Sequence, residues 1–266
     1  MLPLTTYCLC EPCRTAYSIR TDSARLAALL RLQYGEYFYP GRAEGFPISV
    51  TETGGRFEIR TPQGVRTAQF PLQAIDDILF ENTRFDGDIF ALHGAAVEWN
   101  GTACLFLAAT TGGKTTLASY LTSQGFGYIT DDCILLERES FRVRPCCTPI
   151  HLREGGLEVL RRRRAVPERL RLLDDGAVKR YVYTPRRRAG CALPLGAIYF
   201  IQRTEGENSL LPMTATERIT ELMKAPVTDY PVNAEYLKFL SRLAKEKCGR
   251  LLYSEMDFAA EVMQNG

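Results

Sequence analysis

Residues 105–116 read LFLAATTGGKTT, and this stretch decides the fold class. The apolar, β-prone run 102–107 is followed by a short loop of small residues, and Leu117 and Leu121 then continue at helical spacing as far as Gly125. Small residues let successive backbone N–H groups surround an anion, and the following helix adds its positive N-terminal end. The stretch therefore predicts a strand, a phosphate-binding loop and a helix.

The end of this loop matches the last part of the pattern G-x-x-x-x-G-K-[ST]. Gly113, Lys114 and Thr115 supply the glycine, a lysine that reaches the phosphates, and a hydroxyl that ligates Mg²⁺. Ala108 stands at the first glycine of the pattern. Taken alone, the match is as well explained by a chance Gly-Lys-Thr in a turn, but the strand before it and the helix after it favour a nucleotide site. The residues expected to bind the nucleotide are Thr110, Thr111, Gly112, Gly113, Lys114, Thr115 and Thr116.

A second apolar strand, at 126–130, ends in Asp131 and Asp132. In a right-handed strand–helix–strand unit the two strands are parallel, so the two aspartates should lie at the same sheet edge as the loop. One carboxylate can then hold Mg²⁺ together with Thr115, and the other can accept the proton of an attacking hydroxyl. The alternative is an acidic pair that only caps the turn.

The loop is preceded by a predicted two-residue hairpin turn at Asn100-Gly101, between strands 95–99 and 102–107. The register of that hairpin places His93 opposite Ala108, beside the phosphates. There His93 can donate to a phosphate oxygen or tune an aspartate. A core histidine that is satisfied by the backbone is the alternative.

Composition limits the classes of protein to consider. The 266 residues carry a formal charge of +2, with 45% apolar and 24% charged side chains, as in an ordinary globular protein. The near-neutral charge argues against a nucleic-acid-binding surface, and no apolar run is long enough to span a membrane. Nine scattered cysteines and an N-terminus without a basic region ahead of an apolar stretch favour the cytoplasm.

Two domains are expected. Residues 1–88 read as a small α+β domain with helices at 23–32 and 72–82 and an antiparallel meander between them. Residues 89–266 carry the loop, a buried strand at 195–202 and further helices. Of these helices, one runs from a capping box at Thr214 and Glu217 to about Lys224, and one contains Tyr236 and Leu240 and ends near Gly249.

Residues 153–188 form a basic segment in which twelve Lys or Arg face five Asp or Glu. The segment reads as a solvated face, as a nucleic-acid site, or as a dock for an acidic peptide or a phosphorylated product. Few aromatic residues are interleaved for base stacking, which disfavours nucleic acid. Near the N-terminus, Cys8, Cys10 and Cys13 are either free thiols in a strand or three of the four ligands of a zinc site.

At LHGAAVEWNG, at the loop ending in GGKTT, and at Asp131-Asp132, the chain resembles the HPr kinase/phosphorylase family of P-loop serine kinases. The likeness is specific over 91–137 and is closest to the short relatives such as the lasso-peptide precursor kinases. It implies an α/β P-loop core that uses ATP or GTP with Mg²⁺. It also implies that Lys114 and Thr115 bind phosphates and metal, that Asp131 and Asp132 divide the metal and base roles, and that His93 supports the transfer.

The sequence departs from that family at Ala108 and Thr111, which replace glycines, and at the extra Gly112. A side chain at either of the first two positions disfavours positive φ and should alter the path of the loop. The expected function is phosphorylation of a serine on a peptide or small protein, docked on the basic segment. The alternatives are a kinase of a hydroxylated metabolite and a non-catalytic NTP-binding regulatory module. The family resemblance also raises a homo-oligomer as a possibility.

Overall fold

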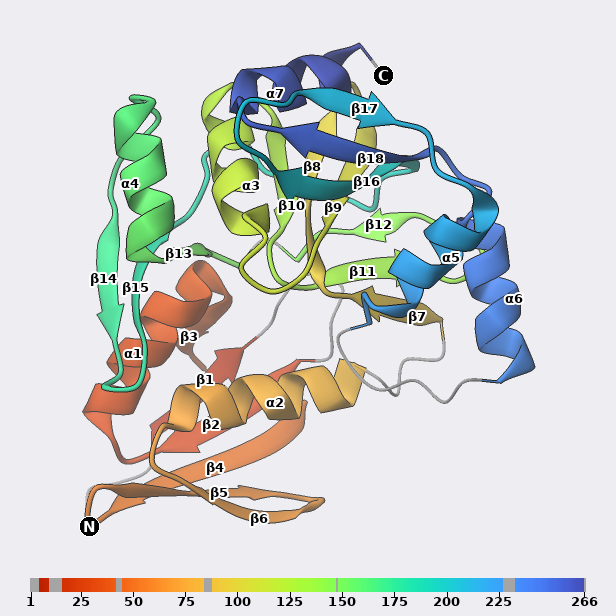
Figure 1. The fold of residues 1–266 in the computed structure, drawn as a ribbon. Coiled ribbons are helices and arrows are strands. Elements are labelled where there is room, and N and C mark those ends of the chain that lie inside the picture. The colour runs from red at the N-terminus through yellow and green to blue at the C-terminus, as the bar shows by residue number, and fades with distance from the viewer. Residues whose placement is uncertain are drawn as a thin grey trace. The chain divides into compact units, whose positions relative to one another are not determined.

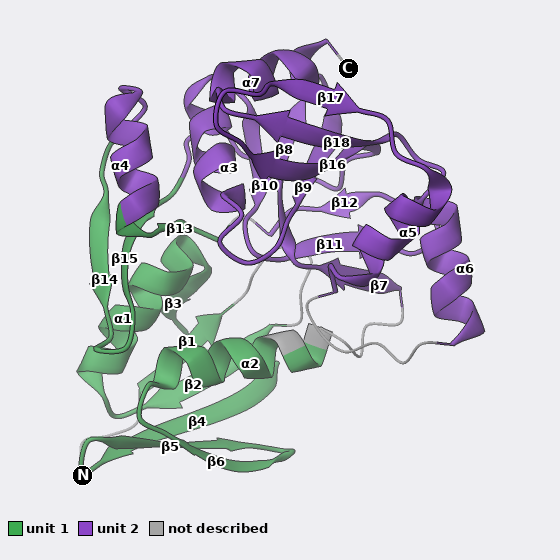
Figure 2. Ribbon diagram, viewed as in Figure 1, with its two compact units in different colours: residues 1–85, 148–154, 168–184 green, residues 86–147, 155–167, 185–266 purple. Residues whose placement is uncertain are grey.

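The computed structural model describes residues 5–9, 16–41, 45–83, 88–146, 148–226 and 233–265. They form a mixed α/β protein (Figure 1). The chain divides into two compact units (Figure 2). The first comprises residues 1–85, 148–154 and 168–184, and the second comprises residues 86–147, 155–167 and 185–266.

The first unit is built on a six-stranded sheet in the order β3-β1-β2-β4-β5-β6. The predicted meander is confirmed, because β4, β5 and β6 pair antiparallel in sequence, while β2 runs parallel to β4. The Ser23 side chain caps the first helix by accepting from the N–H of Leu26. The elements are β1 (Thr5–Leu9), β2 (Tyr17–Thr21), α1 (Ala24–Tyr34), η1 (Gly35–Tyr37), β3 (Phe38–Pro40), β4 (Phe46–Thr53), β5 (Arg56–Thr61), β6 (Gly64–Ala68) and α2 (Pro71–Thr83).

A later part of the chain returns to this first unit. Strands β13 (Ile150–Leu152), β14 (Arg171–Asp174) and β15 (Lys179–Tyr183) form a sheet in the order β13-β15-β14. Leu173 and Val182 are buried in the same apolar core as the helices and sheet described above. This differs from the expected single boundary at 88–89, because apolar burial draws 168–184 into the first unit. The basic segment 153–188 is thus divided between the two units.

The second unit is built on a six-stranded sheet in the order β10-β8-β9-β16-β18-β17. β8 pairs antiparallel with both β9 and β10, so β9 and β10 run in the same direction, with β8 between them. β16 and β18 continue the parallel arrangement beyond β9. The elements of this sheet are β8 (Gly94–Trp99), β9 (Thr102–Leu107), β10 (Gly127–Thr130), β16 (Leu195–Arg203), β17 (Ser209–Leu211) and β18 (Cys248–Tyr253).

The described part of this unit also contains a three-stranded sheet and five helices. The sheet has the order β12-β11-β7. Phe90, Phe239 and Leu240 are among the side chains that join this sheet to the helices in one apolar core. The elements are β7 (Ile89–Leu92), α3 (Lys114–Ser123), β11 (Ile134–Glu137), β12 (Val143–Arg144), α4 (Glu154–Arg162), α5 (Ala215–Met223), α6 (Ala234–Leu243) and α7 (Met256–Gln264); α4 enters the unit at Gly155.

Two local predictions meet different outcomes. The capping box of α5 is present, with the side chains of Thr214 and Glu217 bonded reciprocally to the backbone. The expected end of α6 near Gly249 is wrong, because α6 ends at Leu243 and Gly249 lies within β18. A Cβ on Gly249 would lie 2.7 Å from Leu210 Cδ1, so a glycine at this position gives the Leu210 side chain of β17 the space it occupies. None of the helices in the described ranges is both long and apolar enough to cross a membrane.

Candidate nucleotide-binding site

The loop between β9 and α3 has the path of an anion-binding turn. β9 ends at Leu107, and α3 begins at Lys114. Gly113 precedes the helix with φ +87°, and Thr111 takes φ +68° despite its branched side chain. The left-handed conformation is costly for a β-branched residue, and such positions cluster at functional sites. Thr111 therefore adopts the left-handed conformation that a glycine would adopt at this position, at a cost in strain.

The two other departures of this loop compensate for each other. A Cβ on Gly112 would lie 2.7 Å from the Ala108 Cβ and 2.9 Å from the Ala109 carbonyl oxygen. The Gly112 N–H donates to that same carbonyl at 3.0 Å, which closes the turn. Because Ala108 brings a methyl group to the position where the pattern has a glycine, the extra glycine at 112 provides the space for it.

Lys114 is held inside the loop that precedes it. Its side chain is buried, and Nζ donates to the carbonyl oxygens of Ala108 at 2.9 Å and Ala109 at 3.1 Å. Burial lowers the pKa of Lys114, and the carboxylates of Asp132 and Asp131 oppose that shift. The ammonium is thus held within the loop by two of its carbonyl oxygens.

Thr115 and Asp131 meet at the sheet edge, as expected from the shared direction of β9 and β10. Thr115 Oγ1 donates to Asp131 Oδ1 at 3.1 Å. Asp131 is buried, and its Oδ2 has no hydrogen-bond partner within the described part of the chain. Burial, followed by the charge of Asp132, raises the pKa of Asp131 well above its ordinary value. A hydroxyl beside a carboxylate with a spare oxygen is a donor set that fits Mg²⁺.

Asp132 and His93 lie together beside this pair. Asp132 is exposed and takes φ +66°, and its carbonyl oxygen lies 3.1 Å from His93 Nδ1. Burial, and then the charge of Lys114, lowers the pKa of His93, so the ring is neutral near pH 7. Since a carbonyl can only accept, Nδ1 carries the proton, which leaves Nε2 as an acceptor. His93 can therefore accept a hydrogen bond from a hydroxyl more readily than it can donate to a phosphate.

The register of the hairpin is confirmed as far as the last pair, Gly94 opposite Leu107. The ladder ends there, one step short of the expected pairing of His93 with Ala108. The His93 N–H instead bonds to the carbonyl of Ala225, just beyond α5. His93 is thus bonded by its backbone to Ala225 and by its ring to Asp132.

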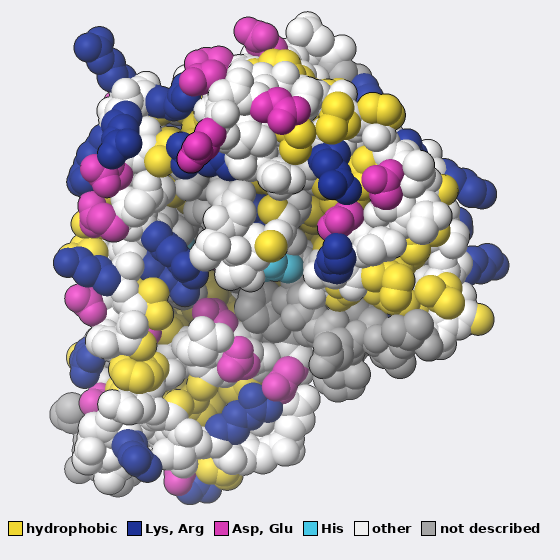
Figure 3. Space-filling model, in the orientation of Figure 1, with side chains coloured by type: hydrophobic (Ala, Val, Ile, Leu, Met, Phe, Trp, Pro, Cys, Tyr) yellow, Lys and Arg dark blue, Asp and Glu magenta, His cyan; other side chains and the backbone are white. Residues whose placement is uncertain are grey.

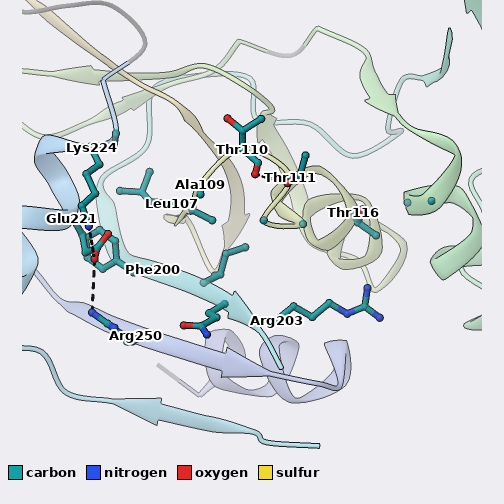
Figure 4. Close-up of a pocket in the computed structure, with 18 of the residues that line it drawn as sticks. Leu107, Ala109, Thr110, Thr111, Thr116, Phe200, Arg203, Glu221, Lys224 and Arg250 are labelled. Carbon is teal, nitrogen blue, oxygen red and sulfur yellow. Dashed lines mark hydrogen bonds and ion pairs between the residues drawn. The ribbon is translucent and has the colours of Figure 1, made fainter. Parts of the chain in front are cut away.

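A cavity of 1010 Å³ opens over the loop (Figure 4). Its walls come from the loop, α4, the end of β16, α5 and β18. Five of the predicted nucleotide-binding residues line it, namely Thr110, Thr111, Gly112, Gly113 and Thr116. The other predicted site residues, Lys114, Thr115, Asp131, Asp132 and His93, are not part of the cavity wall and form the adjacent cluster described above.

Sequence reasoning missed three cationic residues of the cavity wall, Arg203, Lys224 and Arg250. One signal could have found Arg203. It ends β16, which runs parallel to β9, and the carboxyl ends of parallel strands meet at one sheet edge. Across the visible face, Lys and Arg side chains are interspersed with Asp and Glu (Figure 3). The distribution of surface charge therefore does not distinguish the three cationic residues of the cavity wall from other Lys and Arg residues.

The cysteine motif lies mostly outside the described residues. Cys8 is a buried free thiol in β1, whereas Cys10 and Cys13 are not described. No group of three or more His, Cys, Asp or Glu placed to hold a metal is found among the residues that are described. The choice between thiols and a zinc site at the N-terminus stays untested.

No family model matches the sequence, and no curated protein gives a significant match. Among solved structures, the chain is similar to the HPr(Ser) kinase/phosphatase from Coxiella burnetii, with a TM-score of 0.31 and 14% identity. The match covers 66% of this chain and 88% of that chain.

Proposed function

We propose that this chain is a kinase that transfers the γ-phosphoryl group of ATP or GTP to a serine hydroxyl of a peptide. The observation that carries the proposal is the contact of Thr115 Oγ1 with Asp131 Oδ1, at the start of the helix that follows the loop. The loop and the start of α3 supply a lysine and a hydroxyl, and the end of β10 supplies two acidic side chains. These are the parts that phosphoryl transfer requires.

Within this proposal, Thr115 and Asp131 hold Mg²⁺, which neutralises charge on the phosphates when it is bound. The unpartnered Oδ2 of Asp131 is the oxygen available for that role. Lys114 moves from the carbonyls of Ala108 and Ala109 to phosphate oxygens when the nucleotide enters. The N–H groups at the start of α3 complete the phosphate cradle.

Asp132 is the proposed general base. It is exposed, whereas Asp131 is buried beside Thr115, so Asp132 is the carboxylate that an incoming hydroxyl can reach. The hydroxyl oxygen of the acceptor forms the new bond to the γ-phosphorus as the bond from that phosphorus to the β,γ-bridging oxygen breaks. The proton of the hydroxyl passes to Asp132, and neutral His93 accepts a hydrogen bond at the same position.

The acceptor could also be a hydroxylated metabolite, and a regulatory NTP-binding module would use the same loop without an acceptor. A transfer assay separates these functions. The protein is incubated with Mg-ATP and serine-containing peptides, and added phosphate is measured by mass spectrometry. We expect transfer by the wild type and loss of transfer in Asp132→Asn, with Glu205→Gln, an exposed carboxylate outside the cavity wall, as the control.

Three other outcomes contradict the proposal. Phosphorylation of a small hydroxylated compound but not of peptides would replace the acceptor. Nucleotide binding without transfer to any acceptor would indicate the regulatory module. Transfer that is unchanged by Asp132→Asn would remove the proposed base.

A further inference from the structure

The wall of the cavity carries an excess of positive charge at the end formed by α5 and β18. Lys224 Nζ lies 3.1 Å and Arg250 Nη2 lies 3.9 Å from the same oxygen, Glu221 Oε1. Figure 4 shows the three side chains together, with dashed lines to the shared carboxylate. One carboxylate thus fixes two cations side by side, and each cation keeps N–H donors that Glu221 does not use. We refer to Lys224, Arg250 and Glu221 as the cationic end.

The cationic end is connected to the proposed base through the backbone. Ala225 follows Lys224 directly and lines the same cavity, and its carbonyl accepts from the His93 N–H. His93 Nδ1 in turn contacts the carbonyl of Asp132. The cationic end is thus two hydrogen bonds away from the backbone of Asp132, and Ala225 is the point where the cavity wall meets the His93–Asp132 pair.

The phosphates have a different set of donors. The loop from Thr110 to Lys114 and the start of α3 surround the phosphate position, and Arg203 extends from β16 toward Thr116, away from the cationic end (Figure 4). Lys224 and Arg250 are thus not needed for the phosphates. Their side chains are 63% and 34% exposed, so both can meet a ligand from solvent.

From this arrangement we infer that the cationic end binds a carboxylate of the acceptor, so that the acceptor is an acidic peptide with Asp or Glu close to its serine. The inference rests on the proposed function for the identity of the reacting group, and it names the class of peptide. In this proposal the acceptor is recognised in the cavity. The sequence alone suggests the basic segment 153–188 as the docking site, but that segment is divided between two units.

The test compares two short fluorescent peptides that differ only in the residues flanking one serine, Glu in one and Gln in the other. Binding is measured by anisotropy in the presence of Mg²⁺ and a non-hydrolysable ATP analogue. We expect the wild type to bind the Glu peptide about tenfold more tightly, as two partly exposed ion pairs allow. The preference should disappear in Lys224→Gln/Arg250→Gln and fall with added salt.

Two further variants sharpen the result. Lys238→Gln, on the exposed face of α6 and outside the cavity wall, is the matched control and should keep the full preference. Glu221→Gln removes the competing carboxylate and should increase the preference for the Glu peptide. Circular dichroism verifies that each variant is folded.

The inference is overturned if the wild type binds both peptides equally, or if the double variant keeps the preference. If the double variant keeps the preference and also loses affinity for the ATP analogue, measured by calorimetry, the cationic end serves the nucleotide instead of the acceptor. Failure of the proposed function looks different: the Glu peptide binds with its preference intact, and Mg-ATP transfers no phosphate to it.

Discussion

In the second unit, the hairpin turn and the turns of the candidate site reach positive φ with different kinds of residue. The hairpin turn between β8 and β9 uses Asn100 at φ +49° and Gly101 at φ +78°, residue types that accept this conformation readily. At the candidate site, Thr111 and Asp132 take φ +68° and +66°. The first turn serves the fold alone, and its residues follow local preference. Both residues of the candidate site lie where side chains have a proposed role, and Thr111, which is β-branched, is strained there, whereas Asp tolerates positive φ.

The largest expected effect that tests this contrast comes from Asp132→Asn. The change keeps the shape of the side chain and removes its basicity, so turnover should fall about 100-fold or more. Nucleotide affinity should stay within about twofold, because Asp132 is not proposed to hold metal. Steady-state transfer rates and calorimetry with Mg-ATP measure the two quantities. Unchanged turnover would mean that Asp132 is not the base and that its turn has no catalytic role.

The next effect concerns the fit between Gly112 and Ala108. Gly112→Ala places a methyl group against the backbone of Ala109, so the loop must shift, and nucleotide affinity should fall more than about tenfold. Ala108→Gly in the same chain removes one of the two clashes and should restore part of the loss. Gly101→Ala is the control in the hairpin turn. It should cost about 1 kcal/mol of stability, without any change in nucleotide affinity. Equal affinity in Gly112→Ala and wild type would contradict the account of the loop.

Asp131→Asn should raise stability when no divalent cation is present. The change replaces a buried carboxylate by a neutral amide, which removes the cost of burying a charge, and the free energy of unfolding at neutral pH should rise by about 1–2 kcal/mol. Mg²⁺ should stabilise the wild type and not the variant. Urea unfolding with and without Mg²⁺ measures both effects.

The carboxyl of Asp131 should also make the stability of the protein depend on pH. Its pKa is higher in the folded chain than in the unfolded chain, so the folded state binds more protons between the two values. The stability of the wild type should therefore fall as pH rises through that window, relative to Asp131→Asn. If the difference in the free energy of unfolding between wild type and Asp131→Asn did not change with pH, the raised pKa of Asp131 would not be its cause.

The smallest effect should come from Thr111→Gly. Relief of the left-handed strain exceeds the added freedom of glycine in the unfolded chain, and the net gain should be about 1 kcal/mol. Asn100→Gly, the matched change in the hairpin turn, should alter stability by only a few tenths, because Asn already tolerates positive φ. Thermal unfolding of both variants measures the contrast. If the two changes had equal effects, Thr111 would not be strained.

The comparison also explains which features the sequence could predict. The hairpin at Asn100-Gly101, the cap at Ser23 and the capping box at Thr214 depend on residues a few positions apart, and each is present. The common edge of β9 and β10 was predictable as well, because two strands of one sheet that are joined through a helix run parallel and end at the same edge.

What could not be predicted depends on contacts between distant segments. The burial of Leu173 and Val182 in the first unit gives no local signal in a segment rich in arginine. Lys224 and Arg250 come from different elements and meet only through Glu221. The space that Gly112 provides for Ala108 follows from the folded path of the loop, which a sequence pattern does not contain.

The most direct test of the central claim is a calorimetric titration of the protein with Mg-ATP and with Mg-GTP. We expect one site for at least one of the two nucleotides, and loss of that site in Lys114→Met, whose ammonium lies within the loop. No uptake of either nucleotide, or uptake that Lys114→Met leaves unchanged, would contradict the assignment of residues 108–116 as a phosphate-binding loop.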